Sequence, residues 1–153
     1  MQPSRPVVGY IAGVCEPNPG GHAVVAWVAL AKDATVVAKE YRYLGCGMEH
    51  SNNTTAYEAL LRFLGEEVGP NQWQNLPIRT HHKLLVDQLT GVVGCNSPQL
   101  QPLLERATQS CLDLGVRLSW VPREQNVRAA ELARKAAAWL LRERGLPQAV
   151  RQR

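Results

Sequence analysis

The N-terminal third of the chain carries three short apolar runs that are typical of β-strands. Residues 7–14, 23–30 and 35–44 are rich in valine and other residues that favour extended backbone. Asn18-Pro19-Gly20-Gly21 separates the first two runs, because proline fixes φ and glycine allows positive φ. A Lys-Asp-Ala turn at positions 32–34 separates the second run from the third. Three consecutive strands with short connections predict an antiparallel meander.

The spacing of the apolar residues becomes helical near position 54. They recur at i, i+3, i+4, i+7 and i+11, which places them on one face of a helix: Tyr57, Leu60, Leu61, Leu64 and Val68. Asn52 and Asn53 come just before this segment, and asparagine is a favoured helix N-cap. We therefore predict an amphipathic helix that begins near Thr54 with an asparagine cap.

The rest of the chain predicts two more strands and three more helices. The strands are expected at 76–80 and 116–121, and the helices at 83–89, 99–114 and 129–144, with Gly115 ending the second of these helices. The order βββαβααβα, with antiparallel strands first and αβ units later, predicts an α/β fold with a five-stranded mixed sheet flanked by helices. We expect one domain over residues 1–145, followed by a basic C-terminal tail over residues 146–153.

The composition narrows the class of protein without identifying a function. The 153 residues are 45% hydrophobic and 20% charged, as in globular proteins with a sizeable core. No apolar run approaches the roughly 20 residues of a membrane span, and the N-terminus lacks the apolar core of a secretory signal, so we expect a cytoplasmic protein. The four cysteines show neither CxxC pairs nor zinc-finger spacing and are expected to be buried reduced thiols: Cys15, Cys46, Cys95 and Cys111.

Positive charge is concentrated at the C-terminal end of the chain. Nine of the 17 Lys and Arg residues, but only three of the 13 Asp and Glu residues, follow Gly115, which gives this segment a net charge of +6 and leaves −2 for the rest. A basic segment of this kind favours a polyanionic partner such as nucleic acid. A solvated helix face followed by a disordered tail accounts for the charge equally well.

Four short motifs stand at matching places in this element pattern. The first strand runs through Ala12-Gly13 to Asn18-Pro19-Gly20, and the first helix opens with Ser51-Asn52-Asn53-Thr54-Thr55-Ala56. The fourth strand ends at His81-His82, and Val121-Pro122-Arg123-Glu124-Gln125-Asn126 leads into the last helix. In this order the motifs resemble the Asp-Gly…Asn-Pro-Gly, Thr-Asn-Asn-x-x-Glu, Asp-Ser and Val-x-Arg-x-x-Asn-x-x-Ala-Asp motifs of the ribonuclease H family. The resemblance covers nearly the whole chain and implies the ribonuclease H-like fold.

The resemblance also implies which residues stand at the catalytic positions. Ribonuclease H cleaves the RNA strand of an RNA–DNA hybrid with two magnesium ions, which are held by an Asp, Glu, Asp, Asp cluster. The corresponding positions here are Ala12, Ala56, His81 and Ala130, so every carboxylate is replaced. Magnesium prefers anionic oxygen ligands, whereas methyl groups offer none and imidazole is a poor substitute. We therefore expect a pseudoenzyme with no bound metal and no cofactor.

Neighbouring carboxylates and histidines offer no clear replacement for the missing cluster. Glu58 and Glu131 lie two positions and one position beyond the replaced helix residues, which rotates them about 200° and 100° away. Glu16, in the turn after the first strand, is the best remaining candidate, but one carboxylate does not make a two-metal site. His81-His82 could exchange protons near neutral pH. Adjacent side chains project in different directions, however, which does not suit metal-free acid–base cleavage, and no zinc-ligand spacing links this pair to other residues.

Several polar residues of the family motifs are retained. By resemblance they are candidate nucleic-acid contacts: Asn18, Asn53, Gln88, Arg123 and Asn126. Arg128 is a further candidate because it adds positive charge near the rim of the former active site. Amide side chains and helix N-termini suit phosphate and 2′-hydroxyl groups. The alternative is purely structural, because Asn-Pro-Gly is also a turn and Asn-Asn a helix cap.

The resemblance and the charge together predict an inactive ribonuclease H-like domain that binds RNA–DNA hybrid or double-stranded RNA. The main alternative is a scaffold of the same fold whose former cleft or sheet edge meets a protein partner or a second copy of the chain. An active hybrid ribonuclease is the enzymatic alternative.

Overall fold

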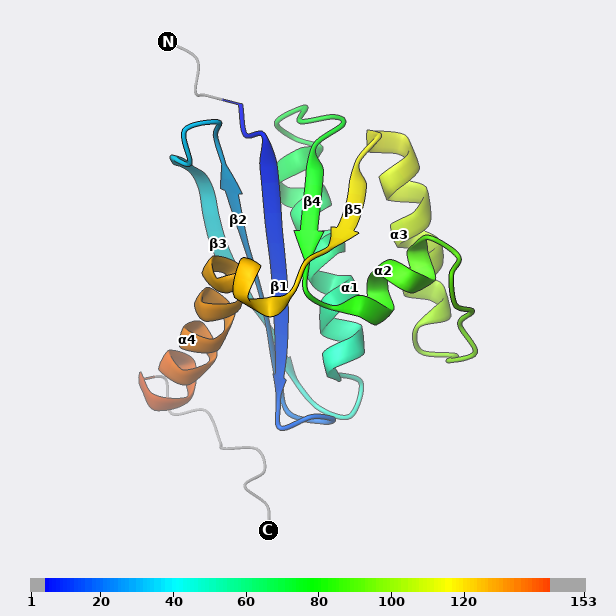
Figure 1. The fold of residues 1–153 in the computed structure, drawn as a ribbon. Coiled ribbons are helices and arrows are strands. Elements are labelled where there is room, and N and C mark those ends of the chain that lie inside the picture. Colours follow the sequence, from blue (N-terminus) through cyan, green and yellow to red (C-terminus); the bar gives the residue numbers. More distant parts are fainter. Residues whose placement is uncertain (1–4, 144–153) are drawn as a thin grey trace.

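β1 (Val8–Glu16) lies at the centre of a five-stranded mixed sheet (Figure 1). The structure is a computed structural model and describes residues 5–143. β1 pairs antiparallel with β2 (His22–Leu30), which pairs antiparallel with β3 (Val36–Cys46). On its other side β1 pairs in parallel with β4 (Pro77–Thr80), and β4 pairs in parallel with β5 (Arg117–Trp120). The strand order β3-β2-β1-β4-β5 confirms the predicted mixed sheet.

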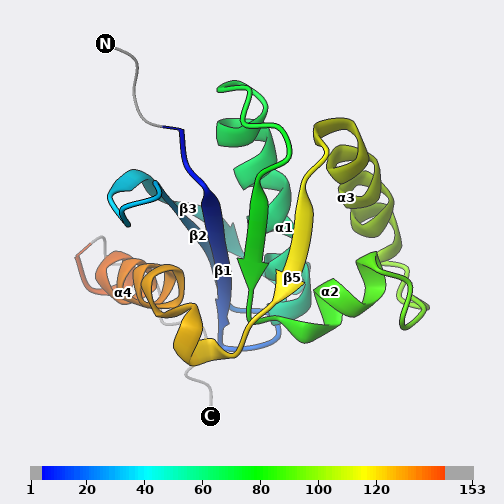
Figure 2. The same cartoon turned by 45° about the horizontal axis from the view of Figure 1, so that its top comes forward.

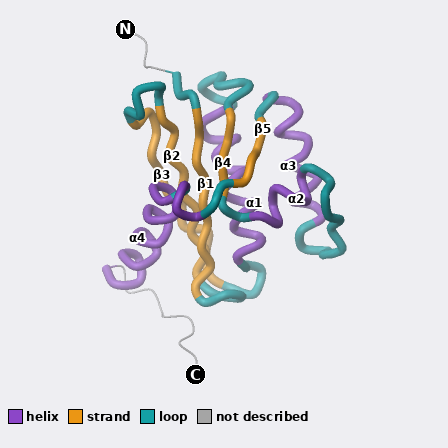
Figure 3. The backbone as a smooth tube through the Cα atoms, viewed as in Figure 1, coloured by secondary structure: helices purple, strands orange, loops and turns teal. Residues whose placement is uncertain are grey.

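The helices cover both faces of the sheet (Figures 2 and 3). α1 (Asn52–Phe63), extended by a π-helical turn at Leu64–Val68, lies on one face together with α3 (Gln101–Leu114). α4 (Val127–Glu143) lies on the opposite face, where it packs on β1, β2 and β3. The short helix α2 (Lys83–Leu89) begins just after β4. The predicted order of elements is therefore confirmed over the described residues.

The burial of β2 explains why its sequence is an almost continuous apolar run. Helices cover β2 on both sides, and every residue from His22 to Ala29 is buried. Trp27 packs against Phe63 of α1 with 6.0 Å between the ring centroids. The predicted inner face of α1 is confirmed, because Tyr57, Leu60, Leu64 and Val68 are buried and Leu61 is partly buried.

Two glycines of β1 allow α1 to lie directly on the strand. A Cβ atom at Gly9 would lie 2.6 Å from the ring of Phe63, and one at Gly13 would lie 2.8 Å from the carbonyl oxygen of Thr55. Both distances are too short for a real Cβ, so these positions require glycine. The contact at Thr55 also fixes the place of Ala56, the next residue along α1.

The predicted asparagine cap of α1 is wrong. Ser51 is the N-cap: its hydroxyl accepts a hydrogen bond from the Thr54 N–H, and the Thr54 hydroxyl accepts one from the Ser51 N–H. This is a reciprocal capping box, in which a threonine occupies the place usually taken by Glu or Gln. Asn52 and Asn53 therefore lie in the first turn of the helix.

The four cysteines differ in how deeply they are buried. All four thiols are free, but Cys15 alone is buried, while Cys95 and Cys111 are partly buried and Cys46 is exposed. The expectation of four buried thiols is therefore wrong. No helix within the described part of the chain is long and apolar enough to cross a membrane. The predicted basic tail, 146–153, lies outside the described residues.

Candidate nucleic-acid interface

Asn126 joins three of the four positions at which the sequence analysis places a replaced carboxylate. Its Nδ2 donates a hydrogen bond of 2.8 Å to the backbone carbonyl of Ile11, the residue before Ala12. The same Nδ2 lies 2.8 Å from Nδ1 of His81. The backbone carbonyl of Asn126 accepts a 3.0 Å hydrogen bond from the N–H of Ala130. A single buried residue therefore joins β1 and the end of β4 through its side chain and the start of α4 through its backbone.

Ala56 reaches the same part of β1 from the other face of the sheet. The carbonyl of Thr55 rests against Gly13, and Ala56 belongs to the buried cluster that contains Ile11. The structure therefore places Ala12, His81 and Ala130 around Asn126, and Ala56 against β1 from the other face of the sheet.

The three alanines at these positions are packed in apolar surroundings. Ala12, Ala56 and Ala130 are only 4–5% exposed. Ala12 and Ala130 belong to one cluster between the sheet and α4, which also contains Ala26, Val28, Ala129 and Ala133. Small side chains on both sides let α4 lie close to β1 and β2.

The carboxylates closest in sequence to the four replaced positions are paired with other side chains or lie elsewhere on the surface. Glu131, next to Ala130, is held by Arg134, whose Nη2 lies 2.8 and 2.7 Å from the two carboxylate oxygens. Asp87 forms a 3.3 Å ion pair with Lys83. Glu16 is exposed at the end of β1. Among residues 5–143, no three His, Cys, Asp or Glu side chains form a group that could hold a metal ion. Magnesium, which the family resemblance implies, does not fit the residues present.

His81 is the one polar side chain among the four replaced positions. It is partly buried at the end of β4, and its backbone carbonyl accepts a 3.2 Å hydrogen bond from the indole N–H of Trp120. Burial lowers the pKa of His81, and the positive charge of Arg123 lowers it further. The pKa of His82 is also lowered, by burial and by His81. His82 is the N-cap of α2, where its Nδ1 accepts a hydrogen bond from the Leu85 N–H at 3.3 Å.

These two histidines predict that the protein loses stability in mild acid. Their pKa values in the folded state lie below those in the unfolded chain, about 6.5. Between these values the unfolded chain binds more protons, so the free energy of unfolding should fall as the pH decreases below about 6.5. Urea unfolding at several pH values measures this slope. The double variant His81→Asn, His82→Asn keeps an acceptor at each position and should flatten it; an unchanged slope in this variant would contradict the assignment.

The candidate contacts predicted from the sequence occupy different environments. Asn18 is exposed, and its Oδ1 accepts a 2.8 Å hydrogen bond from the Asn52 N–H. Asn52 in turn accepts the Cys15 N–H at 3.1 Å, so the turn after β1 is tied to the start of α1. Asn53 is partly buried in the first turn of α1. Asn18 therefore has a structural role through its amide oxygen, on a residue that is exposed to solvent.

Gln88 and Asn126 do not present free amides at the surface. Gln88 is 8% exposed, accepts a 2.6 Å hydrogen bond from the Tyr57 hydroxyl and donates to the Gly94 carbonyl at 3.3 Å. Asn126 is 1% exposed, with the internal partners described above. Both amides hold neighbouring elements together in this conformation, and direct contact of either side chain with a bound polyanion stays a prediction.

Arg123 and Arg128 are exposed on either side of Asn126. Arg123 lies in a 3-10 turn, Arg123–Gln125, and Arg128 lies in the first turn of α4. A pocket of about 250 Å³ opens beside them, lined by Tyr10, Leu30 and residues 124–128. Neither arginine has an ion pair within the described part of the chain, so both charges can meet an external anion.

Trp120 is an exposed aromatic residue that the sequence analysis did not single out. Its side chain is 45% exposed beside His81, and the Lys83 ammonium lies 5.9 Å from the ring centroid. An exposed indole next to a cation is a surface on which nucleic-acid bases can stack. The signal in the sequence was a tryptophan at the end of the last strand, directly before the Arg123 motif.

Comparison with known proteins places this arrangement in a family. The sequence model of the reverse transcriptase-like family matches residues 11–136. The chain belongs to this family and is a ribonuclease H-like domain related to ribonuclease H1 enzymes. The resemblance inferred from the four motifs is thereby confirmed at the level of family and fold.

Solved structures of related proteins show how far the similarity extends. The RNase H1 of the halophilic archaeon Halobacterium salinarum NRC-1 is 30% identical with a TM-score of 0.75, over 86% of this chain and 97% of that one. The N-terminal RNase H domain of a Mycobacterium tuberculosis protein is 28% identical with a TM-score of 0.69, over 86% and 96% of the chains. LC11-RNase H1 in complex with RNA/DNA hybrid is similar in fold, with 24% identity and a TM-score of 0.73 over 85% and 98%.

Proposed function

We propose that this protein is a ribonuclease H-like domain that binds a duplex containing RNA without cleaving it. The observation that carries the proposal is the packing at the four replaced positions. Ala12 and Ala130 share an apolar cluster, Ala56 is buried on the other face of the sheet, and His81 is bound to Asn126. Two-metal cleavage requires ligands that activate the attacking water and stabilise the leaving oxygen, and these side chains cannot hold the metals.

Binding is supported by the charges that surround the same point. Arg123 and Arg128 flank Asn126 in the chain and form no ion pair among the described residues, although the charge of Arg123 also acts on Glu131; Trp120 is exposed beside His81. Without a carboxylate cluster there, a phosphate can approach without crossing a negative field. A related RNase H1 of the same fold has been solved with an RNA/DNA hybrid. We infer that the duplex lies across the start of α4 and the ends of β4 and β5.

The test is a filter-binding assay with hybrid, double-stranded RNA, double-stranded DNA and single-stranded probes at several salt concentrations. Binding should be insensitive to sequence and should weaken steeply with salt, because each neutralised phosphate releases counterions, with a log–log slope of about −0.9 per contact on B-form DNA. Replacing Arg123 and Arg128 by Ala should weaken binding and make the slope shallower by about two contacts. The hybrid should remain intact with Mg²⁺ present.

A matched control removes the same charge elsewhere. Lys39 lies on the edge strand β3, and Arg106 lies on α3, on the face of the sheet opposite α4. Both are exposed, so the variant Lys39→Ala, Arg106→Ala should bind as the wild type does. Equal losses in the two double variants would indicate unspecific attraction to a basic protein. Absence of binding at low salt would reject the nucleic-acid function, and Mg²⁺-dependent cleavage by repurified protein would reject the pseudoenzyme.

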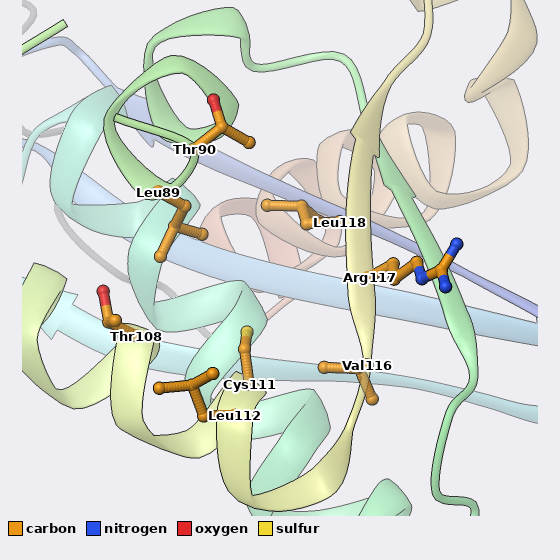
Figure 4. A pocket seen from close by; sticks show the side chains of 8 residues that line it. All are labelled: Leu89, Thr90, Thr108, Cys111, Leu112, Val116, Arg117 and Leu118. Atoms are coloured by element: carbon orange, nitrogen blue, oxygen red, sulfur yellow. The ribbon is translucent and has the colours of Figure 1, made fainter. Parts of the chain in front are cut away.

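A second candidate function, self-association, is favoured by an apolar pocket beside the edge strand β5. The pocket, about 390 Å³ in volume, opens between α2, α3 and β5, and its lining is mostly apolar: Leu89, Thr90, Thr108, Cys111, Leu112, Val116, Arg117 and Leu118 (Figure 4). Leu112 at its rim is 72% exposed. A second copy of the chain could cover this surface. A dimer in sedimentation velocity that Leu112→Glu converts to monomer, with no binding of polynucleotides, would favour this candidate.

A further inference from the structure

The amide of Asn126 has only one orientation that satisfies its neighbours. The carbonyl oxygen of Ile11 can only accept a hydrogen bond, so the group 2.8 Å away must be Nδ2 rather than Oδ1 of Asn126. The reversed amide would place two oxygens against each other. The observed orientation leaves Oδ1 buried without a partner. The reversed orientation would leave Nδ2 buried without a partner and would also lose the hydrogen bond to Ile11. Asn126 is 1% exposed, so it has no solvent to turn into.

This orientation fixes the tautomer of His81. Nδ2 of Asn126 faces Nδ1 of His81 at 2.8 Å, and because Nδ2 is a donor, Nδ1 must accept. A neutral imidazole that accepts at Nδ1 carries its proton on Nε2. A proton on Nδ1 would set two donors against each other, which keeps this ring neutral in addition to the effects of burial and Arg123.

The proton on Nε2 points to a position where a ligand can receive it. Nε2 has no hydrogen-bond partner in the described part of the chain, and it is absent from the buried unpartnered atoms there, so it is open to solvent. Arg123 is close enough for its charge to act on the ring. Glu131 of α4 is already held by Arg134, and Glu124, next to Arg123 in the chain, forms no hydrogen bond with His81. The surroundings of Nε2 therefore favour an anionic acceptor.

We propose that His81, with its Nε2–H held outward by Asn126, donates a hydrogen bond to a backbone phosphate of the bound strand, at the place where the family resemblance implies a metal ligand. Arg123 supplies the accompanying positive charge. The contact needs no metal and binds the phosphate without activating water. This inference rests on the proposed nucleic-acid binding and assigns one phosphate contact of that site to a particular side chain.

Two conservative variants distinguish the roles of the two ring nitrogens of His81. His81→Asn keeps an acceptor for Asn126 at the place of Nδ1 but has no donor at the place of Nε2. His81→Gln keeps a donor that reaches the place of Nε2. If the proposal is correct, His81→Asn weakens binding of a short RNA–DNA hybrid about tenfold, and His81→Gln restores most of the affinity. Urea unfolding of both variants establishes that they are folded.

A long-range proton–nitrogen NMR spectrum of isotope-labelled wild-type protein tests the tautomer directly. The His81 signal, assigned by its loss in His81→Asn, should show the proton on Nε2 at neutral pH, and the Nε2 resonance should shift when hybrid is added. A proton on Nδ1, an Nε2 signal that hybrid does not move, or equal affinities of His81→Asn and wild type would each overturn the proposal. If the wild type binds no hybrid at all, the proposed function fails first, and the tautomer measurement still decides the geometry.

Discussion

Restoring the four carboxylates is expected to destabilise the protein strongly in metal-free buffer. The variant carries Asp in place of Ala12, His81 and Ala130, and Glu in place of Ala56. These side chains would add several like charges to positions that are now buried or partly buried, and the free energy of unfolding should fall by about 3 kcal/mol or more. Millimolar Mg²⁺ should recover part of this loss, because the ion would pair with the new charges. Urea unfolding with and without Mg²⁺ measures both effects.

The control for this experiment adds four carboxylates at exposed positions. Gln74→Glu, Asn96→Asp, Gln99→Glu and Ala138→Glu change the charge on the surface alone and should leave both the stability and its response to Mg²⁺ close to those of the wild type. If the restored variant were as stable as this control without metal, the four positions would not be packed against their neighbours as described above. Cleavage of hybrid by the restored variant is not required, since catalysis also depends on positioning.

The second large effect is expected at Asn126. Replacing this residue by Leu removes the hydrogen bond to Ile11, which leaves a buried carbonyl without a donor, and removes the partner of His81 Nδ1. Leu should fit the volume poorly as well, and we expect a loss of about 2–4 kcal/mol in the free energy of unfolding. Asn96→Leu, at an exposed asparagine in the loop after α2, should change the stability little. Equal effects of the two substitutions in urea unfolding would show that Asn126 does not join the elements.

The fold could be predicted because its signals are local. The valine-rich runs with short turns gave the meander, and the period of Tyr57, Leu60 and Leu64 gave the inner face of α1. The cap of α1 was missed because Ser51, Asn52 and Asn53 are all good capping residues. The choice between them depends on Thr54, whose hydroxyl closes the capping box with Ser51.

The site could be predicted only in part, because its bonds join distant segments. The motifs pointed to Ala12, His81 and Ala130, whose segments Asn126 joins, and to Ala56 on the opposite face of the sheet. They could not show that Gln88 is occupied by Tyr57, 31 positions away, or that Asn126 bonds to Ile11, 115 positions away. A polar residue within a motif has the same sequence signal whether it contacts a ligand or supports a neighbouring element. Only its burial and its hydrogen-bond partners distinguish these two roles.

The alanine-lined contact between β1 and α4 also limits how this protein can change over generations. Ala12, Ala26, Ala129 and Ala130 are small on both sides, so a carboxylate introduced at a single position is packed mainly against methyl groups. Each single step towards a metal site would lower stability, while the metal would bind only when several ligands were in place. The intermediate variants, with one or two carboxylates, would be less stable than the present protein and would still not bind metal. The packing of a few methyl groups therefore makes the present arrangement hard to leave by one substitution at a time.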